Sequence, residues 1–484
     1  MSDTALAEKL ISIVGDRFVL QREGDLLVYN SDGLPGYRRK PRIAVFPANR
    51  EQTIAVVRAL AESGSAYVPR GAGTGLSGGA LADDVVLLGL HRLKKVLSID
   101  TENLRAVVEP GVVNLSLNKT VAPLGLLYAP DPSSEAACTI GGNIAENAGG
   151  PHCLKYGVTL NHVLAITAIL PDGEIVTLGN PEGEIDGYDL RGAFIGSEGC
   201  FGVALDVTVR LTKKPAAIRT MLADFTSIDD AAHVTSAIIA SGIVPAALEF
   251  MDSPTIKVVE SSVYAAGYPA DAAAVLLIEV DGTDAGVNAD RDTIEDICIK
   301  GGARTVKVAR NDAERMKLWQ GRKKAFGAMG RMAPHLVVQD AVIPRTKLAE
   351  VLDKIAQIAA ENRVTVCNVF HAGDGNLHPN IPYNADDPDE AARVHKSMGE
   401  IMRACVDAGG SITGEHGVGL DKIGYIEMIF SQESLSAMCS LREVFDPKRR
   451  SNPGKVVPIH SCQEWRATPA GRSSDANELA GAVL

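Results

Sequence analysis

Apolar residues near the start of the chain fall into a strand, a helix and a second strand. Residues 43–46 are a short apolar run, and apolar residues then recur at helical spacing from about 50 to 63. Asn49 stands where this helix needs an N-cap, and Gly64 stands where it needs a residue that tolerates a left-handed backbone. With the apolar run 66–69 that follows, the pattern predicts a β-α-β unit.

After about residue 214 the pattern changes to longer helices between strands. Helical periodicity covers residues 228–240, 287–300, 348–361 and 391–408, and strands are expected at 273–279 and 364–370. This change indicates a separate α+β unit. The final residues, 461–484, are small and polar and are expected to form a disordered tail.

Composition narrows the class of protein. The chain has 484 residues, of which 46% are hydrophobic and 22% charged, as is typical of a globular protein with more than one domain. Its net charge is −12 and it has no block of Lys and Arg, which argues against nucleic-acid binding. The longest apolar run, residues 272–278, is too short for a membrane span, and the N-terminus lacks the pattern of a signal peptide.

The eight cysteines are scattered along the chain, and no C-x-x-C motif occurs. This usage is typical of reduced thiols in the cytoplasm, so a cytoplasmic location is expected. It also excludes an iron–sulfur cluster of the usual clustered-cysteine type.

A glycine-dense segment follows the β-α-β unit. Residues 69–80 read PRGAGTGLSGGA and contain the G-x-G-x-x-G spacing of dinucleotide-binding proteins. That motif requires a helix to begin at the glycines, whereas this segment leads into the strand-like residues 85–90, so a Rossmann site is rejected. Five glycines accompanied by Arg70, a threonine and a serine instead predict a loop whose backbone amides cradle a phosphate.

A second glycine-rich region, residues 139–150, reads TIGGNIAENAGG and is expected to be another loop. Glycine and alanine let a flat ligand approach closely, and Asn143 and Asn147 can bond its polar edge. Together the two regions predict a large phosphate-bearing cofactor that is contacted at several points.

Two histidines flank a hairpin signal. Residues 364–381 read VTVCNVFHAGDGNLHPNI, in which Asp-Gly at 374–375 is typical of a two-residue turn. With that turn, His371 and His378 are predicted to lie directly opposite each other on one face, with Cβ atoms about 5 Å apart. This spacing suits two ligands of one metal ion, and Asn380 is expected on the same face.

A third histidine lies in the glycine-flanked segment TGEHGVG, residues 413–419. Glu415 would complete a three-ligand metal site of the catalytic type, which keeps open positions. His416, directed differently, would then be available for proton transfer. Taken alone, each histidine fits an ordinary structural role, but the combination predicts a metal site.

Residues 316–326 predict a helix on which Trp319 and Arg322 share a face, with Phe326 one turn further on. An arginine held among aromatic side chains is suited to binding a carboxylate. The same pattern also fits a solvated basic face, so both interpretations stay open at this point.

Several of these motifs together resemble those of the FAD-linked D-2-hydroxyacid dehydrogenases in the vanillyl-alcohol-oxidase flavoprotein superfamily. The likeness spans about residues 10–460 and rests on residues 70–80, 140–150 and 371–378, on GSEG at 196–199, on GEHG at 414–417 and on NPGK at 452–455. Residues 128–134 and 148–157 resemble the group of that family that contains the flavin-bearing D subunits of bacterial glycolate oxidases (glycolate dehydrogenases).

The resemblance implies an α+β fold. It consists of a bipartite FAD-binding domain of the vanillyl-alcohol-oxidase type, an α+β cap domain and a C-terminal segment that returns to the FAD domain. The implied boundaries are an N-terminal helical segment at 1–40, the FAD-binding domain at 41–215, the cap domain with the metal site at 216–435 and the returning segment at 436–460.

The resemblance also implies the cofactor contacts. Those expected for FAD are Arg70, Gly71, Gly73, Thr74, Gly75, Leu76, Ser77, Gly78, Pro110, Gly111, Val112, Gly141, Gly142, Asn143, Asn147, Gly149, Glu198, Gly202 and Asn452. No histidine lies between residues 69 and 80, so the flavin is expected to be non-covalent. His371, His378 and Glu415 are implied as ligands of a divalent metal, namely zinc, manganese or iron.

In the enzymes that the chain resembles, the catalytic roles fall on His416 as the base and on Arg322 and Asn380 as substrate contacts. The 2-hydroxyglutarate-type relatives carry a lysine before a tyrosine–aspartate pair, where this chain reads VVQD at 337–340. A contact for a second carboxylate is therefore missing from the pattern. This favours glycolate or D-lactate, oxidised to the 2-oxo acid by hydride transfer to flavin N5 with help from the metal.

Electrons must then leave the reduced flavin, and the chain has no cysteine cluster to relay them. Flavin and iron–sulfur partner subunits, a quinone or dioxygen are the expected acceptors, and partner subunits would allow peripheral membrane association. The alternatives are a 2-hydroxyglutarate-type dehydrogenase, a non-redox enzyme on the same scaffold such as alkylglycerone-phosphate synthase, and a structural or electron-passing subunit with an idle flavin.

Overall fold

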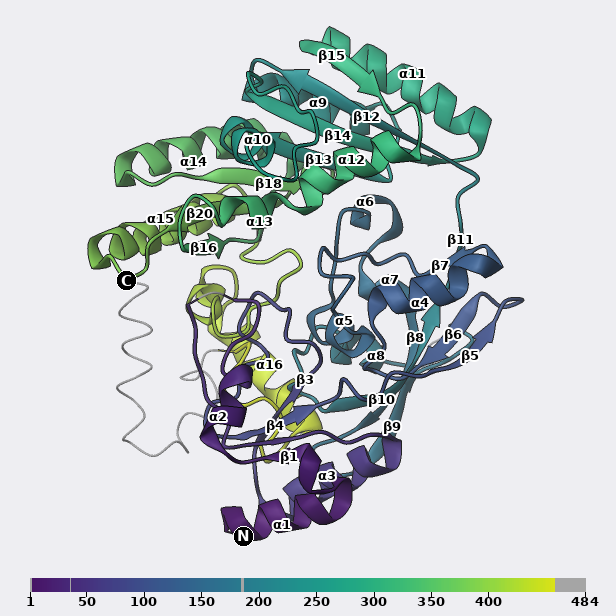
Figure 1. Ribbon diagram of the computed structural model, residues 1–484, viewed down its shortest axis with the longest axis vertical. Coiled ribbons are helices and arrows are strands. Elements are labelled where there is room, and N and C mark those ends of the chain that lie inside the picture. The colour runs from purple at the N-terminus through teal and green to yellow at the C-terminus, as the bar shows by residue number, and fades with distance from the viewer. Residues whose placement is uncertain (1, 35, 184–186, 458–484) are drawn as a thin grey trace. The chain divides into compact units, whose positions relative to one another are not determined.

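The protein, seen in a computed structural model, divides into two units (Figure 1). The structure describes residues 2–34, 36–183 and 187–457, so the predicted disordered tail lies outside the described residues. The first unit combines Met1–Gly149, Gly157–Lys214 and a return segment that begins at Glu415. The second combines Gly150–Tyr156 and Pro215–Gly414. Among the described helices, none is long and apolar enough to cross a membrane.

One sheet of the first unit contains the predicted β-α-β elements. Its order is β1 (Val19–Leu20), β2 (Ile43–Val45), β4 (Val86–Gly89) and β3 (Tyr67–Arg70). β2 and β3 both pair in parallel with β4, so a later strand lies between them. The connecting helix, α3 (Arg50–Ser63), has both predicted caps: Asn49 accepts from the Gln52 amide, and Gly64 has a φ of 72°.

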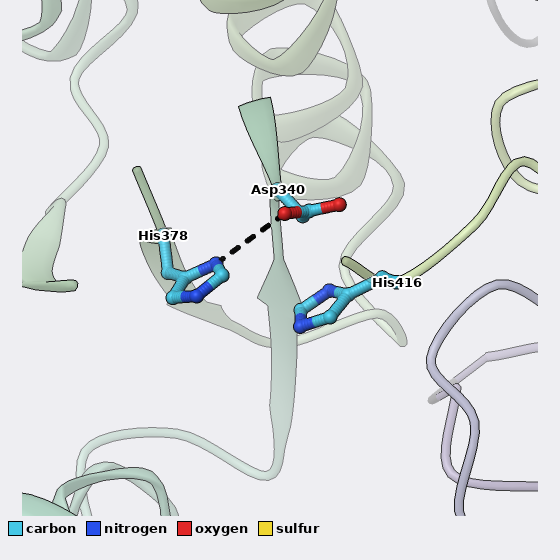
Figure 2. Close-up of side chains that lie close together, drawn as sticks. All are labelled: Asp340, His378 and His416. Atoms are coloured by element: carbon cyan, nitrogen blue, oxygen red, sulfur yellow. Dashed lines mark ion pairs between the residues drawn. The ribbon is translucent and has the colours of Figure 1, made fainter. Parts of the chain in front are cut away.

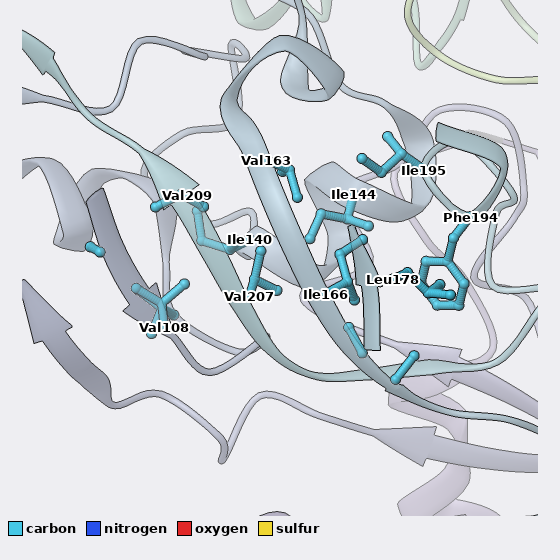
Figure 3. Packing of buried hydrophobic residues seen from close by; sticks show 14 of the residues in the cluster. Val108, Ile140, Ile144, Val163, Ile166, Leu178, Phe194, Ile195, Val207 and Val209 are labelled. Atoms are coloured by element: carbon cyan, nitrogen blue, oxygen red, sulfur yellow. The ribbon is translucent and has the colours of Figure 1, made fainter. Parts of the chain in front are cut away.

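The second sheet of this unit is antiparallel. Its order is β5 (Val96–Asp100), β6 (Arg105–Val108), β10 (Val203–Arg210), β8 (Val163–Ile169) and β9 (Ile175–Gly179). Val207 and Ile166 belong to the core that this sheet builds with α5 (Ile140–Glu146) (Figure 3). Exclusion of these apolar side chains from water is the main stabilising force of the unit.

The region 140–146 is this helix and not the loop that its glycines predicted. Thr139 caps it by accepting a hydrogen bond from the Gly142 amide. Ile140 and Ile144, one turn apart, bury its inner face. The cap and the buried stripe outweigh the helix penalty of two glycines, so the loop prediction was wrong.

The first unit also contains helices and a strand pair outside these two sheets. They are α1 (Asp3–Val14), η1 (Asp16–Phe18), α2 (Glu23–Leu26), η2 (Leu27–Tyr29), α4 (Asn114–Val121), η3 (Ala122–Leu124), α7 (Thr159–His162), α8 (Leu190–Phe194), η5 (Ile423–Met428), α16 (Gln432–Phe445) and the paired strands β7 (Leu126–Leu127) and β11 (Thr212–Lys213).

The return segment completes the first unit. Ser451 forms a parallel bridge with Tyr67 of β3, and the Asn452 amide donates to the Tyr67 carbonyl at 2.8 Å. Phe445, at the end of α16, stacks on Phe201 with ring centroids 4.4 Å apart. The end of the described chain thus lies beside one of its earliest strands.

The second unit is an α+β layer structure, as predicted. Its sheet runs in the order β15 (Ala303–Val308), β12 (Ala217–Phe225), β14 (Ala274–Gly282), β13 (Ala247–Asp252), β18 (Cys367–His371), β19 (Asn376–Leu377) and β17 (Ala341–Val342), with β20 (Pro379–Tyr383) pairing to β18 and to β16 (His335–Val338). The helices are α6 (Cys153–Tyr156), α9 (Ile228–Ala240), α10 (Ser253–Glu260), α11 (Asp284–Lys300), α12 (Asp312–Lys323), α13 (Ala325–Met329), η4 (Arg345–Lys347), α14 (Leu348–Asn362) and α15 (Pro388–Asp407). The four long helices expected from periodicity correspond to α9, α11, α14 and α15.

Candidate functional site

The two hairpin histidines lie on one face but not directly opposite each other. His371 pairs with Asn376, so the register differs by two residues from the predicted one, and the prediction of direct opposition was wrong. A shift of two residues keeps each side chain on its face. The His371 and His378 rings therefore still meet edge to face, with centroids 5.2 Å apart.

The wider turn has a local cause. The Asp374 side chain accepts from the Asn376 amide at 3.2 Å, which closes the turn through a side chain. The Gly375 carbonyl accepts from the Ile343 amide at 3.0 Å, next to the β17–β19 pairing. These contacts with another strand outweigh the local preference for a two-residue turn.

A buried carboxylate joins His371 to Arg322. Glu249, on β13, is the direct cross-strand partner of His371. Its Oε1 lies 2.7 Å from His371 Nδ1, and its Oε2 accepts from Arg322 Nε at 2.6 Å. Burial alone would raise the pKa of Glu249, but the charge of Arg322 and the hydrogen bonds from His371 and Arg322 lower it below its ordinary value. All three side chains are buried, with 3% exposure or less.

Arg322 is therefore not on a solvated basic face, and that interpretation of its helix is excluded. The predicted helix over 316–326 is interrupted at Lys324, where α12 ends before α13 begins. Trp319, predicted to share the face of Arg322, donates from Nε1 to Glu279 at 2.8 Å. Trp319 and Arg322, about one turn apart on α12, thus donate hydrogen bonds to two different buried glutamates.

His378 is held by a backbone carbonyl and a second acid. Its Nδ1 lies 3.3 Å from the Gln339 carbonyl oxygen and 3.9 Å from Asp340 Oδ1, the ion pair drawn in Figure 2. Asp340 Oδ2 accepts from the Thr413 hydroxyl at 2.6 Å and from the Gly414 amide at 2.9 Å. Asp340 therefore ties His378 to the end of the second unit.

Asn380 uses its amide nitrogen within the fold. Nδ2 donates to the carbonyls of Cys367 at 3.0 Å and of His378 at 2.6 Å. Its Oδ1 is buried and has no hydrogen-bond partner among the described residues. A buried acceptor without a partner is costly unless a ligand or water bonds it.

Glu415 and His416 are the first residues of the return segment and follow directly on Gly414. The His416 Nε2 atom lies 3.7 Å from Glu415 Oε1. Beyond them, the amides of Val418 and Gly419 donate to the two oxygens of Glu198 at 2.7 and 2.8 Å. Glu198 thereby fixes the segment that carries the predicted base.

Glu198 is one of two neighbouring buried acids. Burial raises its pKa to about 7, against the hydrogen bonds from Val418 and Gly419. Burial and the charge of Glu198 raise the pKa of Glu146 as well. A Cβ atom on Gly417 would lie 2.5 Å from Glu146 Oε2 and 2.7 Å from Glu198 Oε1, so both carboxyl groups pack against this glycine.

The first glycine loop has no helix after it and leads into β4, which confirms that a Rossmann site is absent from this part of the chain. Arg70 donates from Nη2 to the Ser31 carbonyl at 2.8 Å. Gly73 has a φ of +68°, and a Cβ atom there would overlap the Arg70 guanidinium. The loop conformation thus requires glycine at this position.

The residues present fit a bound FAD. Ser77 Oγ in the first loop and Asn143 Nδ2 in α5 are buried without hydrogen-bond partners among the described residues. Because buried polar atoms normally have a hydrogen-bond partner, these two groups are suited to bonding a polar ligand. Asn452 has a different role, because its Nδ2 donates to the carbonyls of Gly79 at 2.8 Å and Glu198 at 2.5 Å. Asn452 therefore links the backbone of the first glycine loop to that of Glu198.

The histidine motifs did not predict two further residues of this site, Glu249 and Asp340. The signal for Glu249 was available, because it is a lone charge inside the apolar run 245–251. A charge in a buried strand requires a partner. Asp340 carried no comparable pattern.

Comparison with known proteins agrees with this architecture. The family model "FAD binding domain" matches residues 41–179, and "FAD linked oxidases, C-terminal domain" matches residues 214–456. Glycolate oxidase subunit GlcD of Escherichia coli K12 is 45% identical over 93% of this chain and 90% of its own length. D-lactate dehydrogenase of Anaerostipes hadrus is 32% identical over 87% of this chain and 90% of its own.

A solved structure of p-cresol methylhydroxylase shares the fold. Its TM-score is 0.80 at 15% identity, and the match covers 93% of this chain and 96% of that one. At this identity the likeness concerns the fold alone. The fold is therefore the one that the motifs predicted, an FAD-binding fold of the vanillyl-alcohol-oxidase type with a second α+β domain.

Proposed function

The chain belongs to the FAD-linked oxidase family and is an FAD-dependent hydroxyacid oxidoreductase, and on that premise we propose that it oxidises glycolate or D-lactate to the 2-oxo acid with the help of a divalent metal. The observation that carries the metal-assisted reaction is the buried group in which Glu249 joins His371 to Arg322, with the His378 ring 5.2 Å from that of His371. Paired imidazoles beside a guanidinium suit a cation and a carboxylate.

A small monocarboxylate is favoured over a dicarboxylate. Residues 337 and 338, where 2-hydroxyglutarate-type enzymes would place a lysine, are valines in β16. Val338 is buried and pairs with Asn380, and Val337 pairs with Ile381. These side chains offer no charge to a second carboxylate. The names of the two relatives, glycolate oxidase subunit and D-lactate dehydrogenase, support the same class.

Each residue has a proposed role. FAD, when bound, supplies the hydride acceptor at N5, and the metal supplies a Lewis acid. His371, His378 and Glu415 would hold the metal, and non-covalent FAD would be held by the first glycine loop and its neighbours. Arg322 binds the substrate carboxylate, and His416 accepts the proton of the 2-hydroxyl. Asn380 Oδ1 accepts a hydrogen bond from the substrate side.

The route of the electrons is also a proposal. The Escherichia coli relative is named a subunit, which supports the presence of partner subunits. We expect such partners to carry flavin or iron–sulfur clusters. A quinone and dioxygen are the other acceptors that suit this chemistry. A cytoplasmic location, with peripheral membrane association through such partners, follows from the same proposal.

Anaerobic reduction of the flavin tests the proposed function. The holoprotein is mixed with glycolate, D-lactate, L-lactate or D-2-hydroxyglutarate, and flavin absorbance is followed. Glycolate or D-lactate should bleach the flavin fastest. Faster bleaching by D-2-hydroxyglutarate would replace the proposed substrate. Absence of bleaching by every acid would favour a non-redox enzyme or an idle flavin.

A further inference from the structure

Glu249 occupies a buried position where an ionised side chain is energetically unfavourable. It lies in β13 between β14 and β18, opposite Leu277 on one side and His371 on the other. Its exposure is 0%. An ionised carboxylate in such a place is tolerated only when it is paired and hydrogen-bonded.

The two oxygens of Glu249 have different partners. Oε1 contacts His371 Nδ1 at 2.7 Å, whereas Oε2 accepts from Arg322 Nε at 2.6 Å. The partners come from separate elements, the strand β18 and the helix α12. One side chain therefore bridges the imidazole to which the proposed function assigns the metal and the guanidinium to which it assigns the substrate carboxylate.

This bridge determines which ring nitrogen of His371 carries the proton. A carboxylate paired with a guanidinium only accepts hydrogen bonds, so Nδ1 of His371 carries the proton. The lone pair of the neutral ring is then on Nε2, which is the nitrogen that can ligate a metal. A carboxylate in this position also makes a histidine a stronger ligand.

The bridge also fixes the orientation of Arg322. The guanidinium is planar, so holding Nε–H against Glu249 sets the plane and the direction of both Nη groups. The position of the carboxylate-binding group relative to His371 is then determined by one residue instead of by two independent contacts.

We infer that Glu249 is a positioning residue that holds the proposed metal ligand His371 and the proposed substrate ligand Arg322 in one fixed arrangement. The inference rests on the proposed function for the roles of those two residues. It adds that the affinity for metal and the affinity for substrate depend on the same carboxylate.

Glu249→Gln is the direct test, because glutamine keeps the shape but offers one acceptor and one donor. It cannot accept from both His371 Nδ1–H and Arg322 Nε–H. We expect the dissociation constant for metal to rise about 10- to 100-fold, as for other partners of metal-binding histidines. At saturating metal, KM for the substrate should rise more than kcat falls.

Glu279→Gln is a matched control. Glu279 lies in the adjacent strand β14, is 1% exposed, and is also held by an arginine, since Arg315 donates from Nε at 2.8 Å and from Nη2 at 2.9 Å. A histidine, His152, lies 3.4 Å from its Oε1. This second buried glutamate thus reproduces the environment without either proposed ligand, and its variant should keep the wild-type metal affinity.

The experiment measures Zn²⁺ and Mn²⁺ binding separately, by titration calorimetry of the chelator-treated flavin-bound protein, together with flavin content and steady-state kinetics. Weaker metal binding and higher KM in E249Q alone, with flavin content unchanged, would support the inference. Wild-type affinity and KM in E249Q would overturn it while leaving the proposed function intact. Equal weakening in E279Q would also overturn it, as a general packing effect. Failure of the wild-type protein to bind either metal would reject the metal in the proposed function, and the inference with it.

A second measurement needs no folded variant at Glu249. In the wild-type protein labelled with ¹⁵N-histidine, the imidazole shifts of His371, assigned by their loss in H371Q, should report a neutral ring protonated on Nδ1. The Nε2-protonated tautomer would contradict the inference even if E249Q failed to fold.

Discussion

The carboxylate of Asp340 holds Thr413, a residue 73 positions further along the chain, by a hydrogen bond of 2.6 Å from the Thr413 hydroxyl. The Gly414 amide donates to the same oxygen at 2.9 Å. Asp340 also pairs with His378. One buried side chain therefore contacts a proposed metal ligand and the residues that directly precede another.

Asp340→Ala should weaken both the fold and the reaction. It removes the acceptor for Thr413 and Gly414, which we expect to cost about 1–3 kcal/mol of unfolding free energy. Turnover should fall because the segment before Glu415 loses its anchor. Urea unfolding and steady-state kinetics measure the two effects. Thr413→Val, which removes one of the two bonds, is the control, and equal effects of both variants would show that Asp340 has no additional role.

His378→Ala should separate the metal from the flavin. His378 belongs to the second unit, whereas the predicted flavin contacts belong to the first. The variant should lose bound metal and metal-dependent turnover yet keep its yellow flavin. Metal analysis and visible absorption of the purified protein give both quantities. Unchanged activity in a metal-free variant would remove the metal from the mechanism.

Arg322→Lys should raise KM for the substrate about 10- to 100-fold, because an ammonium cannot bond Glu249 and a carboxylate in the planar geometry of a guanidinium. Flavin content should stay at the wild-type level. Initial rates over a range of glycolate and D-lactate concentrations provide the test. A KM equal to that of the wild type would show that the substrate carboxylate binds elsewhere.

Glu198→Gln should change how stability depends on pH. Burial raises the pKa of Glu198 to about 7 in the folded protein, above its unfolded value, so folding favours the protonated form. Its stabilisation is therefore complete below the unfolded pKa and is lost as pH rises towards 7, by about 3 kcal/mol.

The variant has no carboxyl group to titrate at this position. Its unfolding free energy should consequently fall less between pH 5 and pH 8 than that of the wild type, as measured by denaturant titration at each pH. Equal slopes for the two proteins would show that Glu198 does not carry the raised pKa.

The fold was predictable where local signals and burial agree. Asn49 and Gly64 both cap α3 because their side-chain and backbone preferences act within a few residues. The insertion of β4 between β2 and β3 was not predictable in this way, since strand order depends on contacts across the sheet. The glycines of α5 predicted a loop, and this prediction was wrong because a buried helix face and the Thr139 cap outweighed their local preference.

The candidate site was predictable in its residue types but less so in its geometry. The hairpin containing His371 has a register set by β17, a strand about 30 residues upstream, which no local turn rule includes. The lone charge in an apolar run indicates that Glu249 is buried with a partner, but its pairing with His371 depends on contacts between distant strands. The metal ligands, the FAD contacts and the catalytic roles themselves stay predictions that the variants above address.

The bridge between Ser451 and Tyr67 has a consequence for how the protein is made. β3 lies at the edge of its sheet, and its outer side receives Ser451 only after the chain has been synthesised as far as that residue. Until then the nascent chain carries an open strand edge, which is the kind of surface that recruits other strands and leads to aggregation. A product that terminates upstream of residue 451 therefore lacks the bridge that covers this edge.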